Sequence, residues 1–282
     1  MARSTVFDKL ANSWNISKEI ERIHELIFER ESIRAFNRSR LTIVRVFDYY
    51  IFGEWNKRGH CLDFNDFLDV IEFEDLFKAA KADIESQLDF LELCYNLIYQ
   101  VDNLITDQPS DFIPYDDYSL ARTIIDDCLD RLNYRSFIDE SDSTVILVEK
   151  DTAVSAVVEI EEDQEIALDI IQYNHHTLKG NIKKKKSILI KLANELEASR
   201  TQLTSINKSL ATDVFMLFNN LDIRHNNAHD GSKNYQKVVA EMSSDELENW
   251  YDELYQMVLL AKLELDNAER TKKVAELKAS FT

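Results

Sequence analysis

Glycine and proline are scarce in this sequence, with four Gly and two Pro among 282 residues. Turn-rich all-β folds and glycine-rich phosphate-binding loops need more glycine than this. Long helices need very little, and 45% of the residues are hydrophobic, which is enough for a substantial core. The composition therefore predicts a mainly α-helical protein and disfavours kinases, NTPases and α/β-hydrolases.

Long apolar runs and a paired set of cysteines are also missing. No apolar stretch approaches the roughly 20 residues that cross a bilayer, and residues 1–8 lack the apolar core of a signal peptide. Cys61, Cys94 and Cys128 are far apart and odd in number, which is typical of buried free thiols in a reducing compartment. We therefore expect a cytoplasmic protein without a membrane partner, and neither a metal nor another cofactor.

Charge is unevenly distributed along the chain. The net charge is −19, which argues against general coating of nucleic acids. Residues 174–237, however, contain eleven Lys or Arg against five Asp or Glu, a local charge of about +6. Lys183, Lys184, Lys185 and Lys186 form the densest part of this basic island. Two interpretations stay open: a phosphate-contacting site, or a solvated helix face.

Hydrophobic periodicity predicts helical bundles with one small β-hairpin insertion around residues 134–148. Helical patterns cover residues 16–55, as two helices or one interrupted helix, and then about 63–77, 91–105 and 118–132. Shorter helical pieces follow at 152–160 and 165–171, and long patterns begin near 182 and 244. Ser243-Ser244-Asp245-Glu246 resembles a capping box at the start of the last helix. Residues 107–114 contain both prolines and predict a boundary between an N-terminal region, 1–110, and a C-terminal domain, 115–282.

A leucine repeat lies in the second half of the chain. Leucines recur every seven residues at Leu189, Leu196, Leu203 and Leu210. Such a seam packs either within one bundle or between two chains. The intramolecular bundle is the favoured interpretation, and a homodimer surface is the alternative.

The most distinctive segment is Ile223-Arg224-His225-Asn226-Asn227-Ala228-His229-Asp230-Gly231. It follows an apolar helical stripe directly, so several hydrogen-bonding groups lie at the end of a core helix. Burying them there is costly unless they find partners or face a polar cleft.

This segment resembles the motif of the HEPN families, which are helical bundles with an Arg, four to six intervening residues and a His. Here Arg224 and His229 match the pair, and Gly231 matches a glycine that often follows the His. The region 182–278 also resembles the C-terminal helical part of abortive-infection proteins. The resemblance covers about the last 100 residues and does not extend to residues 1–110. It implies a metal-independent RNA endonuclease that acts as a toxin or anti-phage effector.

The resemblance also implies roles for individual residues. Arg224 would clamp the phosphate and His229 would transfer protons, while His225, Asn226, Asn227 and Lys233 would bind or orient the RNA. Two protomers would face each other, and residues 1–110 would bind a sensor or antitoxin. The alternative is a non-catalytic interaction module in which Arg224 and His229 cap a helix C-terminus.

Overall fold

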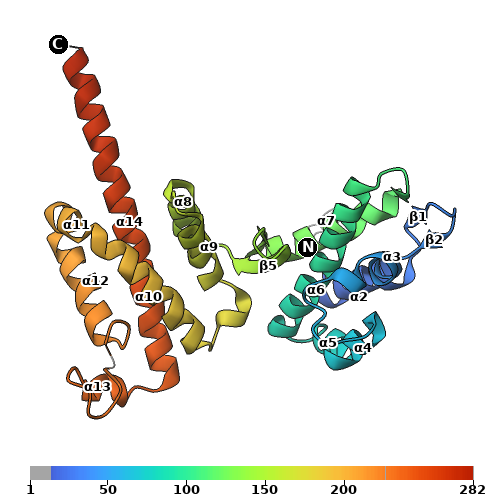
Figure 1. The fold of residues 1–282 in the computed structure, drawn as a ribbon, viewed down its shortest axis with the longest axis horizontal. Helices are drawn as coiled ribbons and strands as arrows, with labels where there is room; N and C mark the ends of the chain where they lie inside the picture. The colour runs from blue at the N-terminus through green and yellow to red at the C-terminus, as the bar shows by residue number, and fades with distance from the viewer. Residues whose placement is uncertain (1–13, 226, 282) are drawn as a thin grey trace, which may run out of the picture. The chain divides into compact units, whose positions relative to one another are not determined.

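The computed structural model describes residues 14–225 and 227–281, and it divides into two compact units, 1–147 and 148–282. The protein is mainly α-helical, as the composition predicts (Figure 1). The boundary between the units along the chain falls within the β-hairpin, not at the proline-containing segment 107–114. Helices on both sides of that segment pack together in the first unit, so the prolines mark a connection between helices. None of the described helices is long and apolar enough to cross a bilayer.

The first unit is built from short helices around one long helix. Its elements are α2 (Ile16–His24), a π-helical turn (Glu25–Glu29), β1 (Ile33–Ala35), β2 (Arg40–Leu41), α3 (Ile43–Tyr50), a 3-10 turn (Phe52–Glu54), α4 (Phe64–Val70), α5 (Phe73–Ala79), α6 (Ile84–Asp107), β3 (Phe112–Pro114), α7 (Asp116–Arg131), β4 (Tyr134–Asp139) and β5 (Thr144–Glu149), whose last two residues belong to the second unit.

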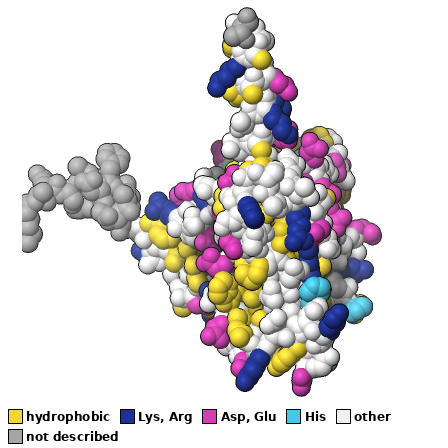
Figure 2. All heavy atoms as spheres, turned by 90° about the vertical axis from the view of Figure 1, so that its left-hand side faces the viewer, with side chains coloured by type: hydrophobic (Ala, Val, Ile, Leu, Met, Phe, Trp, Pro, Cys, Tyr) yellow, Lys and Arg dark blue, Asp and Glu magenta, His cyan; other side chains and the backbone are white. Residues whose placement is uncertain are grey.

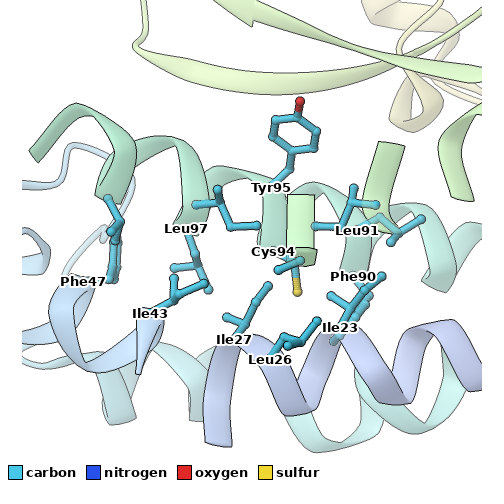
Figure 3. Packing of buried hydrophobic residues seen from close by; sticks show 14 of the residues in the cluster. Ile23, Leu26, Ile27, Ile43, Phe47, Phe90, Leu91, Cys94, Tyr95 and Leu97 are labelled. Carbon is cyan, nitrogen blue, oxygen red and sulfur yellow. The ribbon is translucent and has the colours of Figure 1, made fainter. Parts of the chain in front are cut away.

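The core of the first unit lies around α6. Figure 3 shows side chains of α6, among them Leu91 and Cys94, interleaved with those of α2 and α3. All three cysteines are buried free thiols, as predicted, and burial raises the pKa of Cys94 well above its usual range. A thiol in this setting is an apolar packing group.

The predicted hairpin is confirmed as β4 and β5. It is fixed to α6 by polar contacts to its backbone. The Asn96 amide donates to the carbonyl of Val145 at 2.7 Å and accepts from its N–H at 2.8 Å, and Glu92 accepts from Leu147 N–H at 2.7 Å. A two-stranded hairpin is marginal alone, so this support explains its persistence.

A second, three-stranded sheet was not predicted. Strands β1, β2 and β3 pair in the order β2-β1-β3, with both pairs antiparallel. Strands of two or three residues are too short to show an alternating pattern in the sequence, and β3 pairs across a separation of about 80 residues. The expected helical region 16–55 is therefore two helical segments separated by β1 and β2.

The second unit is a helical bundle. It contains α8 (Thr152–Ile160), α9 (Gln164–Tyr173), a 3-10 turn (His176–Leu178), α10 (Ile182–Ala198), α11 (Arg200–Ile206), α12 (Lys208–Asn220), α13 (Lys237–Ala240) and α14 (Ser244–Ser280). The predicted capping box is present, with Ser243 and Glu246 exchanging hydrogen bonds at the start of α14. The far end of α14 stands clear of the bundle and carries charges of both signs (Figure 2).

The leucine repeat packs inside this bundle. Leu189, Leu196 and Leu203 are fully buried and Leu210 nearly so. The repeat is not one helix, because the chain breaks at Ser199 and again at Asn207, whose side chain caps α12 by accepting from Leu210 N–H at 3.1 Å. The intramolecular interpretation is thus confirmed, and these leucines are not available for pairing with a second chain.

Candidate functional site

The Arg224–His229 segment lies in the loop between α12 and α13, residues 221–236. Helix α12 ends because the chain turns at Asp222, which adopts a left-handed conformation with φ of 60°. Aspartate tolerates this region better than most residues other than glycine. The Arg224 N–H then donates back to the carbonyl of Phe218 at 3.1 Å, which closes the helix end.

Asn227 holds the loop together. It is only 1% exposed, and its amide accepts from Asp222 N–H at 3.0 Å and donates to the carbonyl of Asn234 at 2.8 Å. Its own carbonyl accepts from Gln236 N–H at 2.8 Å. Both ends of the Asn227 amide are therefore used within the loop, so its visible role is structural and differs from the RNA-orienting role expected from the sequence.

Arg224 points back onto the bundle. Its side chain is 18% exposed, forms an ion pair with Glu197 of α10, and donates to the carbonyl of Ala193 at 2.6 Å. The guanidinium also lies over the rings of Phe215 and Phe218, with centroid distances of 5.4 and 5.3 Å. These contacts fix the start of the loop against α10 and α12.

The Glu197 carboxylate is shared between two arginines. Besides Arg224, it binds Arg200 at 3.1 Å. Partial burial would raise the pKa of Glu197, but the two guanidinium groups outweigh this effect and hold the pKa below its usual range. The Glu197 carboxylate therefore holds Arg224 against α10 through their ion pair.

The other predicted site residues of the loop, where the structure describes them, face solvent. His225, His229 and Lys233 are exposed, whereas Asn226 lies outside the described residues. His229 is tied to the loop through its backbone, since its carbonyl accepts from Ser232 N–H at 3.1 Å. The structure thus fixes the backbone that carries His229 and leaves its imidazole accessible.

The basic island divides into two pairs. Lys183 and Lys184 are exposed near the start of α10. Lys186 binds Asp222 at 2.5 Å, which brings this end of α10 beside the loop. Lys185 is 6% exposed and is therefore not a solvent-facing phosphate contact.

Lys185 belongs to a partly buried polar network that sequence reasoning missed. Its ammonium binds both Glu248 and Asp252 at 2.7 Å, and Asp252 also accepts from the Tyr173 hydroxyl at 2.9 Å. Burial would raise the pKa of Glu248, but Lys185 and the Gly180 N–H hold it below its usual range. The sequence does contain a signal, because Lys185 lies on the same helical stripe as Leu189 and Leu192.

Comparisons with protein-family models, with curated proteins and with solved structures found no match to this chain. The geometry of the loop itself indicates which reactions its side chains can support. An accessible imidazole on a fixed backbone can transfer protons near neutral pH. A guanidinium can bind a phosphate, provided that the phosphate takes the place of a carboxylate already bound to it.

Proposed function

We propose that the C-terminal unit is a metal-independent endoribonuclease of the HEPN type, acting as a toxin or anti-phage abortive-infection effector in the cytoplasm. One observation carries the proposal: the loop is fixed by buried Asn227 and by Arg224, yet it exposes His229. A rigid loop with an accessible proton-transfer group at a helix end is what such a site requires.

The chemistry uses the nucleophile of RNA itself. The 2′-hydroxyl attacks the adjacent phosphorus, its proton passes to a base, and the 5′-oxygen leaves with a proton from an acid. The products are a 2′,3′-cyclic phosphate and a 5′-hydroxyl. His229 transfers a proton, and a homodimer supplies a second His229 for the other transfer. Lys183, Lys184 and Lys233, all exposed, contribute positive charge for the RNA backbone.

Arg224 has a role in this scheme that depends on Glu197. The carboxylate occupies guanidinium positions that a phosphate would take, so RNA must compete with Glu197. Neutralising the carboxylate in Glu197→Gln weakens that competition. We therefore expect Glu197→Gln to bind and cleave RNA more strongly than the wild type at equal helical content.

The proposal is tested by induced expression of the wild type and His229→Ala, with growth followed and total RNA examined on a gel. His60→Ala is the matched control, because His60 is an exposed histidine of the first unit with no role in the proposed site. The wild type and the control should arrest growth and fragment RNA, and His229→Ala should do neither. Equal RNA fragmentation by His229→Ala would contradict the assignment.

A second candidate is a non-catalytic helical interaction module. The inward orientation of Arg224 favours it, because an arginine bound to Glu197 and Ala193 serves packing as it stands. Under this alternative, Glu197→Gln lowers the stability of the second unit and has no effect on RNA. The same variant therefore distinguishes the two functions, since only the nuclease predicts stronger RNA binding.

A further inference from the structure

A second concentration of positive charge lies in the first unit, far from the Arg224 loop in sequence. Residues 30–45 contain five arginines, no lysine and a single acidic residue, Glu31, a local charge of about +4 in a chain of −19. Arg30 is paired with Asp117 at 2.9 Å. Arg34, Arg38, Arg40 and Arg45 are exposed. An all-arginine segment in an acidic protein indicates a site for an anion.

The three-stranded sheet brings two of these arginines together. On β1, Ile33 and Ala35 are buried and Arg34 between them is exposed, so Arg34 lies on the outer face. Arg40 of β2 is paired directly with Arg34 across the strands (β1 and β2 are labelled in Figure 1). Like charges directly opposite each other destabilise a sheet. A bound anion between the two guanidinium groups would turn this repulsion into attraction.

The turn between β1 and β2 presents a third arginine. Arg38 has φ of 66°, in the left-handed region that glycine adopts without steric cost. The turn is well defined, because Ala35 N–H donates to Ser39 carbonyl at 2.9 Å and Arg38 N–H donates to Ala35 carbonyl at 2.8 Å. This defined turn fixes the backbone that carries the exposed Arg38 side chain.

Aromatic side chains accompany these arginines: Phe36 lies between Arg34 and Arg38 in the chain, and the Arg40 guanidinium lies over the Tyr115 ring, 5.1 Å from its centroid. Phe36 is 63% exposed and Tyr49 is 60% exposed, and Tyr50 contacts both rings edge-on, with centroids 6.5 and 6.4 Å away. The arginine–aromatic surface thus consists of Arg34, Phe36, Arg38, Arg40, Tyr49 and Tyr50. Exposed aromatic rings beside cations are the means by which proteins hold unpaired bases and their phosphates.

We propose that the arginine–aromatic surface binds single-stranded nucleic acid, with the phosphates on the arginines and bases stacked on Phe36 and Tyr49. A duplex hides the faces of its bases and offers only its backbone, so it binds more weakly. The inference concerns the first unit alone and does not depend on cleavage by the second.

The experiment measures fluorescence anisotropy of labelled 12-nucleotide oligo(U), oligo(dT) and a 12-base-pair duplex with the full chain. His229→Ala is the background, so that cleavage cannot affect binding and failure of the nuclease proposal leaves this test intact. The background protein should bind both single strands more tightly than the duplex. A preference for oligo(U) over oligo(dT) would identify RNA as the ligand. Equal binding would show that the surface accepts single strands of both RNA and DNA.

The triple variant Arg34→Glu, Arg38→Glu, Arg40→Glu should lose at least tenfold in affinity at 50 mM salt. Its salt dependence should also fall, since each lost phosphate contact removes about 0.7 from the slope of log affinity against log salt. The matched control reverses three exposed cations elsewhere, in Arg22→Glu, Lys78→Glu, Arg270→Glu, with the same change in net charge.

Two single variants separate binding from folding. Phe36→Ala should weaken single-strand binding by about 5- to 150-fold, the effect of one stacked base, without changing the salt slope. Arg38→Gly removes a charge but relieves the left-handed backbone, so affinity should fall while the melting temperature is unchanged or rises. If Arg38 served folding alone, Arg38→Gly would not lower the affinity while leaving the melting temperature unchanged or higher.

Four results would overturn the proposal. They are no binding of the background protein to either single strand at 50 mM salt, equal binding of strand and duplex, equal affinities of the triple variant and its control, and binding to anionic lipid vesicles in place of oligonucleotides. The last result would assign the surface to a membrane.

Discussion

Asn227 offers the sharpest test of how the loop is built. In Asn227→Ala, two partly buried backbone groups lose their partners, the Asp222 N–H and the Asn234 carbonyl. A fully buried group left without a partner costs about 1–3 kcal/mol, and because these two are only partly buried we expect about 1–2 kcal/mol each, or about 2–4 kcal/mol of unfolding free energy for the second unit. With a urea dependence of about 2 kcal/mol per molar, the unfolding midpoint of this unit should fall by about 1–2 M.

The assay uses tryptophan fluorescence in urea. Trp250 is the single tryptophan in residues 148–282, so a Trp14→Phe, Trp55→Phe background reports unfolding of the second unit alone. The matched control is Asn234→Ala. It removes an exposed amide from the same loop and keeps the backbone carbonyl that Asn227 uses. Equal midpoints for Asn227→Ala and Asn234→Ala would refute the assignment of Asn227 as the residue that holds the loop.

Three further predictions follow from the same contacts. Arg224→Ala should destabilise the second unit by about 1–2 kcal/mol, as measured by urea unfolding. The value is modest because Glu197 is partly exposed to solvent. Glu248 contributes stability above its unfolded-state pKa of about 4.3, and this is lost as the pH falls through the lower folded-state value, so Glu248→Gln should flatten the stability–pH curve there. Leu203→Ala should cost about 2–5 kcal/mol and Leu260→Ala, which is exposed, less than about 0.5, both by thermal unfolding.

Much of the fold could be predicted from the sequence because long amphipathic stretches dominate it. The hairpin at 134–148, the helix at 152–160 and the capping box at Ser243 all carry local signals, and all are confirmed. The two compact units divide between residues 147 and 148, away from the prolines, because a proline ends a helix whether or not a unit ends there. The short strands β1, β2 and β3 depend on pairing between distant segments, which no local pattern reveals.

The candidate site could be predicted only in part. The sequence singles out the Arg224–His229 segment. The ion-pair partner of Arg224 is Glu197 of α10, and no local sequence pattern predicts this pairing. Asn227 was expected to face a ligand, although a polar side chain at a turn is often used by the turn itself. The sequence analysis includes Lys185 in the basic island, because a run of four lysines does not show which of them faces inward.

The central claim is tested most directly by incubating purified full-length protein with 5′-labelled single-stranded RNA in EDTA. The wild type should cleave it to fragments ending in a 2′,3′-cyclic phosphate, and His229→Ala should reduce the rate by at least a hundredfold at unchanged helical content. His60→Ala, purified in parallel, should retain cleavage. Cleavage that EDTA abolishes, or that persists in His229→Ala, would contradict a metal-independent reaction centred on His229, as would no cleavage by the wild type.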